Sequence, residues 1–223
     1  MDLYIKLIDL YIMYLVIKRV IDTFIACVMV IILSPVLILV AIAVKLDSKG
    51  PAIFKQERIG KDFKPYKMWK FRSMVVNAQN MGTGVYSFAG DPRITKVGRI
   101  LRKTSLDELP QLWNIIKGEM AFVGPRSPVV GHFPKYEELN DAYKRRFTIL
   151  PGITGLAQVT GRNELPWDEK VYYDNIYIDK IKKYGIFYDI KMWIMTFVRV
   201  LSMKDVEETQ ENMEKNKETI GKN

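Results

Sequence analysis

FIACVMVIILSPVLILVAIAV, residues 24–44, contains no charged side chain. As a helix, this stretch is long enough to cross the roughly 30 Å of hydrocarbon in a bilayer. Ser34 and Pro35 stand near its middle. Proline removes one backbone donor and clashes with the carbonyl four residues earlier, so it bends a helix, and a neighbouring serine hydroxyl can bond the freed carbonyl. The stretch therefore predicts a membrane helix with a bend in it.

The basic residues that flank this stretch do not identify an outer end. Lys18 and Arg19 precede it, and Lys45 and Lys49 follow it, whereas the positive-inside rule needs an excess on one side. Two paths stay open, a straight span and a re-entrant hairpin that leaves on the side where it entered. The proline and the symmetrical flanks favour a re-entrant helix over residues 18–47, broken at the Ser-Pro pair.

Two further stretches suit the membrane–water interface. Residues 1–17 mix Leu, Ile and Tyr with Lys6 and Asp9, which is typical of an amphipathic helix lying in the interface. Residues 184–201 mix aromatic side chains with Lys191 and Arg199, which suits the headgroup level, but an ordinary core helix has the same composition. Both interpretations of residues 184–201 stay open.

The two ends of the chain carry weaker signals. Ala41-Ile42-Ala43 imitates a signal-peptidase site, but the preceding apolar run is too long for a typical signal peptide. Residues 204–223 are rich in Glu, Lys and Asn with almost nothing to pack, so we expect a disordered tail. This leaves residues 48–203 as one compact domain in a chain of 223 residues.

Charge and composition exclude some kinds of site. The net charge of +9 indicates anionic partners, such as nucleic acid, anionic lipid or a polyphosphate substrate, without choosing among them. The single cysteine, Cys27, and the single histidine, His132, give neither a disulfide framework nor a zinc cluster. We expect His132 to be a solvated loop residue rather than a catalytic base.

Short β-like runs, turns and helices alternate through residues 48–203, which predicts an α+β domain. Neither a GxGxxG turn nor a GxxxxGK[ST] loop is present, so phosphate must be held by side chains. Singly, each basic residue is most simply a surface charge. As a set close to turns, they suit fixed phosphate contacts, and the candidates are Lys70, Arg72, Arg102, Arg126 and Arg162.

A pair of acids, Asp107 and Glu108, precedes the helical pattern of LPQLWNIIKGEM. Pro110 is tolerated only in the first turn of a helix, so Asp107 is expected at or beside the N-cap. A capping box from Ser105 to Glu108 is the alternative, but it would place Pro110 inside the helix. The positive end of the helix dipole should keep Asp107 ionised. An ionised aspartate can attack phosphorus, and Mg²⁺ suits Asp107 together with substrate oxygens.

Several motifs occur together and in a fixed order: the Ser-Pro pair in the apolar helix, FKQERIG, KFRSM, SLDELPQLWN, GEMAFVGPR and PGITGLAQVTGRN. In these the chain resembles the bacterial sugar transferases, the monotopic polyprenyl-phosphate phosphoglycosyl transferases. The likeness extends from Lys18 to Val200. It is closest to the short form of the family, as in the undecaprenyl-phosphate bacillosamine phosphotransferase.

The resemblance implies a reaction in two half-reactions. Asp107 would attack the sugar-linked phosphorus of a UDP-sugar and release UMP, and polyprenyl (undecaprenyl) phosphate would then take the phosphosugar. Glu108 would assist as a base or through the metal. Arg102 and Arg126 match family positions near the phosphates, and Lys70 is a further contact.

The resemblance also implies a place in the cell. Ser34 and Pro35 match the family's break, which implies a re-entrant helix in the inner (cytoplasmic) membrane with the catalytic domain on the cytoplasmic face. Two departures from the family pattern affect the site. Ser127 replaces a proline after Arg126, and Leu150 replaces a common arginine, for which the neighbouring Arg145 or Arg146 are possible substitutes.

Two functions without catalysis were also considered. A membrane-anchored basic binding or assembly protein should carry its basic residues in one stripe with aromatics. Here they lie in separate turns around two acids, which repel a nucleic-acid backbone, so we expect no nucleic-acid partner. A bitopic structural protein leaves LDELPQLWN without a role. The transferred sugar, the polymer made from it and the oligomeric state are not encoded in any motif.

Overall fold

The computed structural model describes residues 2–88, 90–131, 133–161 and 165–202. Three sequence predictions therefore lie outside the described residues: the phosphate contact of Arg162, the loop position of His132 and the disorder of residues 204–223. The elements are α1 (Asp2–Asp47), β1 (Ile53–Ile59), β2 (Pro65–Phe71), α2 (Lys96–Thr104), α3 (Gln111–Lys117), β3 (Ala121–Val123), α4 (Asp141–Arg145), β4 (Gly152–Thr154), α5 (Leu156–Thr160), α6 (Trp167–Tyr184) and α7 (Ile186–Ser202), with 3-10 turns at Lys61–Phe63, Ala78–Asn80, Leu106–Glu108, Tyr136–Glu138 and Arg146–Thr148.

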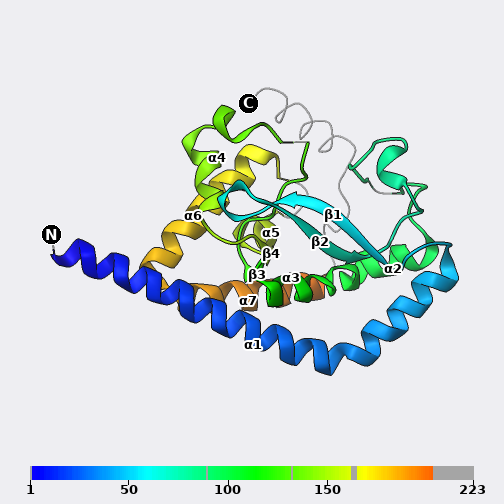
Figure 1. Ribbon diagram of the computed structural model, residues 1–223, viewed down its shortest axis with the longest axis horizontal. Helices are drawn as coiled ribbons and strands as arrows, with labels where there is room; N and C mark the ends of the chain where they lie inside the picture. The colour runs from blue at the N-terminus through cyan, green and yellow to red at the C-terminus, as the bar shows by residue number, and fades with distance from the viewer. Residues whose placement is uncertain (1, 89, 132, 162–164, 203–223) are drawn as a thin grey trace.

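Helix α1 is a single bent helix beneath the rest of the molecule (Figure 1). It runs without interruption through residue 17 and through the Ser-Pro pair, so the predicted N-terminal segment and the predicted membrane helix are one element, and the expected break is a bend. Pro35 is the proline inside the helix. The Ser34 hydroxyl donates to the carbonyl of Ile31 at 2.8 Å. Ile31 is four residues before the proline, so the predicted repair of the freed carbonyl is confirmed.

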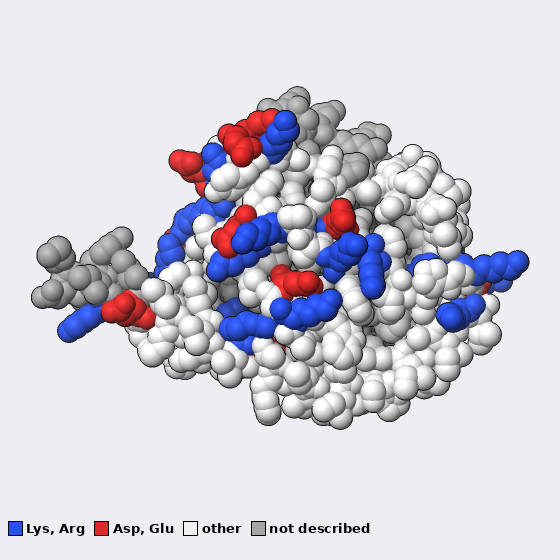
Figure 2. All heavy atoms as spheres, in the orientation of Figure 1, with Lys and Arg blue, Asp and Glu red and all other residues white. Residues whose placement is uncertain are grey.

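By length and composition, α1 can cross a membrane. Within the described residues it is the one such helix, over 9–47, and only 6% of its most apolar window is buried. Ile31 and Ile32 are 73% and 68% exposed, which would be costly in water but is normal in lipid. Figure 2 shows a largely uncharged surface along the lower edge of the molecule, where α1 lies, with charged side chains gathered above it.

Both arms of α1 pack against the same domain. In the first arm, Tyr14 donates to the buried Asp189 of α7 at 2.7 Å. Lys18 forms an ion pair with the same carboxylate at 3.0 Å. In the second arm, Val40 and Val44 belong to a hydrophobic cluster with β2 and α2. The domain therefore contacts α1 on both sides of its bend.

The domain above α1 combines helices with two small sheets, which confirms a mixed helix and sheet fold. Strands β1 and β2 form an antiparallel hairpin, and β3 pairs with β4 in parallel. The main core packs α3, β3, α6 and α7 against β2 and α1 around Leu112, Ile115, Tyr177 and Ile178. Helix α7 buries Met192 completely but leaves Phe197 67% exposed, so it has both the core face and the apolar outer face that its composition left open.

Candidate active site

Asp107 and Glu108 lie in a 3-10 turn between α2 and α3. Ser105 ends α2 with a left-handed backbone, φ 58°, and its side chain caps nothing in the turn. Pro110 is the N-cap residue of α3. The predicted position of the proline at the helix start is therefore confirmed, and the capping box is absent. Asp107 lies one turn before α3 rather than at its N-cap.

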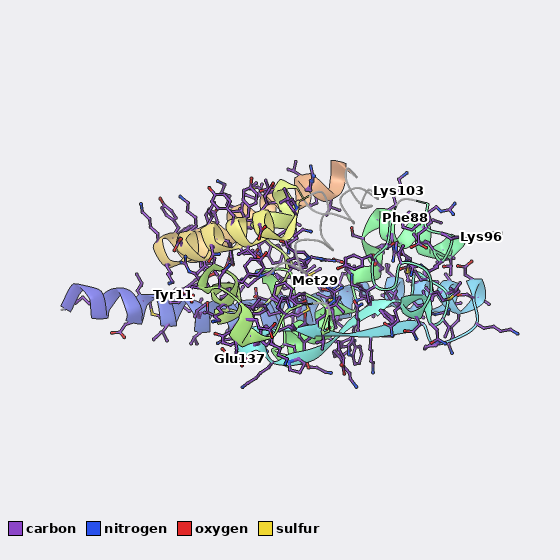
Figure 3. The ribbon with its side chains drawn as sticks, turned by 90° about the horizontal axis from the view of Figure 1, so that it is seen from above. Tyr11, Met29, Phe88, Lys96, Lys103 and Glu137 are labelled. Atoms are coloured by element: carbon purple, nitrogen blue, oxygen red, sulfur yellow. The ribbon has the colours of Figure 1, made fainter. Side chains whose placement is uncertain are left out.

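A cavity of about 590 Å³ opens beside this acid pair. At its charged end, Lys70, Arg102 and Arg126 lie around Asp107 and Glu108, the two acids of its described lining. Its other end is apolar and reaches Met29 of α1, near the middle of the molecule in Figure 3, and the aromatic side chains of α7. The charged lining residues are Arg58, Lys70, Arg102, Asp107, Glu108, Arg126, Lys170 and Arg199.

Glu108 is held by two cations. Lys70 Nζ lies 2.8 Å and Arg126 Nη2 lies 3.1 Å from its Oε1 atom. Burial by itself would raise the pKa of Glu108, but the charges and hydrogen bonds of Lys70 and Arg126 outweigh it and hold this pKa well below its usual range. Glu108 is thus a permanent anion that orients two cations towards the cavity.

Asp107 differs from its neighbour. It is 8% exposed, and within the described residues its carboxylate has no recorded hydrogen bond or ion pair. Burial, which is only partly offset by Lys70, raises the pKa of Asp107, and the negative charge of Glu108 adds to this. The expectation that the helix dipole keeps Asp107 ionised stays a prediction, because Asp107 precedes α3 by a turn and burial is the largest influence on its pKa. A desolvated carboxylate without partners is a better nucleophile than a solvated one.

Two glycines allow the strand pair to bring Arg126 to Glu108. A Cβ atom on Gly152 would lie 2.1 Å from the backbone nitrogen of Gly124. The two chains therefore approach so closely that no side chain fits between them. Gly124 starts the loop that carries Arg126, so this contact sets the position of the guanidinium.

Arg102 comes from the last turn of α2 and lines the same cavity. Its guanidinium donates to the hydroxyls of Ser73 and Ser87. Ser87 belongs to the loop after β2, which lies against α2 where Figure 3 labels Phe88 and Lys103. Arg102 thus fixes this loop at the edge of the cavity.

A model of the bacterial sugar transferase family matches residues 13–203 of the chain. The chain belongs to this family. The resemblance drawn from the sequence is thereby confirmed.

Three relatives of the chain carry names from sugar transfer or polysaccharide production. It is 45% identical over 184 residues to the UDP-glucose:undecaprenyl-phosphate glucose-1-phosphate transferase of Escherichia coli (strain K12), covering 80% of this chain and 39% of that protein. It is 41% identical over 199 residues to the galactosyl transferase CpsE of Streptococcus agalactiae serotype III, covering 84% and 43%. It is 45% identical over 152 residues to the exopolysaccharide production protein PSS of Rhizobium leguminosarum bv. phaseoli, covering 67% and 76%. The first two relatives are thus matched over less than half of their length.

One predicted phosphate contact of the sugar transferase is wrong. Arg72 is 5% exposed and does not line the cavity. Its guanidinium donates to the carbonyls of Ser48 at 2.8 Å and of Pro51 at 2.7 Å, just after α1. Arg72 directly follows the end of β2, and its side chain reaches the turn that follows α1 instead of the cavity that Lys70 lines. Its role is to hold the end of α1.

The residues proposed to replace the family's arginine at Leu150 do not enter the cavity either. Arg145 forms an exposed ion pair with Asp179. Arg146 is buried, pairs with Asp174 at 2.8 Å and donates to the carbonyl of Arg126 at 2.7 Å. Arg146 therefore supports the loop that carries Arg126 and makes no anion contact in the cavity.

Ser127 keeps the loop in place without the family's proline. Its hydroxyl lies 2.8 Å from the Tyr66 hydroxyl, and its carbonyl accepts from Arg58 at 2.7 Å. These two contacts hold the backbone at Ser127 in place, where the family has the rigid ring of a proline.

Sequence reasoning gave no role in the site to several polar residues of the cavity, among them Arg58, Gln158, Lys170 and Arg199. Arg58 and Gln158 stand inside the quoted motifs FKQERIG and GLAQVTGRN, so the motifs marked them without assigning a role. Lys170 and Arg199 lie on α6 and α7, far from any motif. No local pattern could have found them, because the packing of these helices against the strands brings them to the cavity.

Proposed function

We propose that this chain transfers a sugar phosphate from a UDP-sugar to polyprenyl phosphate in the inner membrane and so starts a membrane glycoconjugate. The observation that carries the proposal is the cavity itself. A cluster of cations around Asp107 suits a diphosphate, and the apolar end beside α1 and α7 suits a lipid chain. A water-soluble donor and a membrane-bound acceptor must reach the same atom, and few arrangements allow this.

In the first half-reaction, a carboxylate oxygen of Asp107 attacks the sugar-linked phosphorus of the donor. A bond from oxygen to phosphorus forms, the bond to the bridging oxygen breaks, and UMP leaves with that oxygen and its electron pair. Arg102, Arg126 and Lys70 are placed to stabilise the charge that develops on the phosphate oxygens. The product is a phosphosugar bound covalently to Asp107.

In the second half-reaction, a phosphate oxygen of the polyprenyl phosphate attacks the same phosphorus. The bond to Asp107 breaks, the carboxylate is restored, and a lipid-linked diphosphosugar leaves. The reaction is a double displacement, and so the donor half-reaction can be measured without the acceptor.

Magnesium fits this site through Asp107 alone. The described residues contain no group of three acidic, His or Cys side chains that could form a protein cage, and Glu108 is already bound to two cations. Mg²⁺ typically takes one or two carboxylates and completes its shell with substrate phosphates and waters. Asp107 would hold the ion, and the ion would supply positive charge that offsets the charge of the donor phosphates.

The deciding experiment compares Asp107→Asn with wild type in a panel of UDP-sugars with undecaprenyl phosphate and Mg²⁺. We expect the variant to release no UMP, and we expect mass spectrometry of wild type with donor alone to show a phosphosugar adduct on Asp107. Equal UMP release by both proteins would overturn the nucleophile. The panel also identifies the sugar.

A further inference from the structure

The β1–β2 hairpin presents different chemistry on its two faces. Lys70 points to the active-site cavity, and the residues on either side of it, Trp69 and Phe71, line a second cavity of about 210 Å³. Alternation along the strand accounts for this division. We call the second cavity the crevice. All of its lining residues are apolar: Val30, Leu37, Ile38, Ala41, Ile53, Trp69, Phe71, Leu109, Pro110 and Trp113.

The crevice lies between the bent helix and the domain. Four of its lining residues come from α1, on both sides of the bend at Pro35. The others come from the hairpin and from the start of α3, which lie above α1 in Figure 1. The membrane-exposed face of α1 and this crevice are therefore parts of the same apolar region, and hydrocarbon from the bilayer is the solvent nearest to it.

Two lysines mark the rim of the crevice. Lys55 pairs with Trp69 across the hairpin, and its Nζ atom lies 4.3 Å from the centre of the indole ring. Lys117 Nζ lies 4.7 Å from the same ring. Lys117 follows Trp113 by four residues on α3, so the two share one face of the helix. On both the hairpin and α3, a tryptophan that lines the crevice therefore has a lysine beside it at the rim.

The charges of these two ammonium groups are not offset by a salt bridge in the part of the chain that the structure describes. Within the described residues, neither lysine takes part in a recorded ion pair. The nearby Glu119 is held by the side-chain amide of Asn114 at 2.6 Å. Two cations on one tryptophan repel each other unless an anion lies between or beside them. The rim is therefore complementary to a phosphate.

We propose that the crevice binds one anionic phospholipid of the surrounding bilayer, with an acyl chain along the apolar lining and the headgroup phosphate at Lys55 and Lys117. The polyprenyl phosphate acceptor is a poorer fit. A phosphate at this rim is on the hairpin face opposite Lys70, and the crevice shares only Leu109 with the described lining of the active-site cavity. The bound lipid would fill the space under the bend and hold α1 against α3.

Tryptophan fluorescence can report occupancy directly. The chain has four tryptophans. Trp69 and Trp113 line the crevice, whereas Trp167 and Trp193 line the active-site cavity. A full-length W167F/W193F variant in vesicles therefore reports the crevice. The probes are phosphatidylglycerol and phosphatidylcholine with brominated acyl chains, which quench tryptophan on contact and differ in headgroup charge.

We expect brominated phosphatidylglycerol to quench at a lower mole fraction than brominated phosphatidylcholine. Adding K55Q/K117Q should raise the phosphatidylglycerol midpoint about thirtyfold, which corresponds to about 1 kcal/mol for each lysine. The matched control K61Q/K64Q removes two exposed lysines from the turn of the same hairpin and should leave the midpoint unchanged. Equal midpoints for the two lipids, or for K55Q/K117Q and K61Q/K64Q, would overturn the proposal.

Two further measurements distinguish lipid binding in the crevice from the proposed transferase reaction. Unlabelled polyprenyl phosphate should not relieve the quenching, and relief at low mole fractions would mean that the crevice belongs to the acceptor. Adding Asp107→Asn should leave the quenching intact, because lipid binding needs no turnover. If the transferase assay fails, the lipid-binding proposal is unaffected. If the quenching assay fails, the proposed transferase reaction is unaffected.

Discussion

Asp107 and Glu108 are adjacent in sequence, yet their surroundings shift their pKa values in opposite directions. Burial raises the pKa of Asp107, whereas Lys70 and Arg126 overcome burial and lower that of Glu108. The pair thus separates two tasks. Glu108 holds two cations, and in the proposed reaction Asp107 carries the attacking oxygen, which must be ionised.

The pH dependence of UMP release should report this electrostatic arrangement. Lys70 lowers and Glu108 raises the pKa of Asp107. Since Asp107 acts when deprotonated, the acid limb of the rate profile should move to higher pH in Lys70→Met and to lower pH in Glu108→Gln. Both variants should also be slower, by roughly 100-fold, because charge stabilisation is lost. If the acid limb moved in the same direction in both variants, the assignment of Asp107 as the group that must be deprotonated would be contradicted.

Arg102 and Lys103 form a matched pair at the end of α2. Arg102 lines the cavity, and Lys103 is exposed on the same turn. Arg102→Ala should lower kcat/KM for the UDP-sugar by roughly 10- to 100-fold, the value of a charged hydrogen bond or two. Lys103→Ala should change it less than twofold. Steady-state kinetics at a saturating acceptor concentration distinguishes the two, and equal effects would remove Arg102 from donor binding.

At the scale of single elements, the end of α1 depends on Arg72. Its guanidinium bonds several carbonyls between Val44 and Pro51 and so ties together the last turn of α1 and the turn that follows it. Arg72→Ala should therefore lower the free energy of unfolding by about 3 kcal/mol, with little change in KM for the donor.

Thermal unfolding of Arg72→Ala in detergent checks this, with Arg99→Ala, an exposed arginine of α2, as the control. A raised KM with normal stability would restore the phosphate contact that the sequence suggested for Arg72.

The bend of α1 is also an element-scale property, and it is largely local. Ser34 bonds the carbonyl that Pro35 cannot bond, only three residues away. A bend therefore needs no tertiary contact to form. The positions of the two arms do need tertiary contacts, since one arm bonds Asp189 of α7 and the other packs on β2 and α2.

For the whole molecule, the contacts on either side of the bend favour a re-entrant path in the bilayer. Lys6 and Lys49 are both exposed, one near each end of α1. In a Cys27→Ser background, cysteines introduced separately at these positions should be labelled by a membrane-impermeant maleimide from the same face of sealed vesicles. Labelling from opposite faces would establish a straight span and end the re-entrant proposal.

The mixed fold also explains why one cavity has both a charged end, which suits a water-soluble substrate, and an apolar end, which suits a lipid. The hairpin, the turn with Asp107 and the β3–β4 pair supply its charged end, and α1 and α7 supply its apolar end. The buried Asp189 joins these parts, because it accepts from Tyr14 of α1 at 2.7 Å and from Tyr177 of α6 at 2.6 Å. The network therefore joins α1 to α6 and α7, the helices that line one side of the cavity.

Local sequence was sufficient for features that depend on near neighbours. The apolar stretch, the bend at Pro35 and the start of α3 at Pro110 follow from backbone chemistry within one or two helical turns. Asp107 and Glu108 could be singled out for the same reason, since they are adjacent in one motif.

Only the tertiary structure decided which side chains are desolvated and which charges meet. It turned Arg72 away from the cavity, brought Arg58 and Lys170 into it, and buried Asp107, which raises the pKa of its carboxyl group. It also placed Trp69 and Lys70 in two different cavities. Burial and long-range charge contacts arise from the packing of segments that are far apart in the chain, so no local pattern contains them.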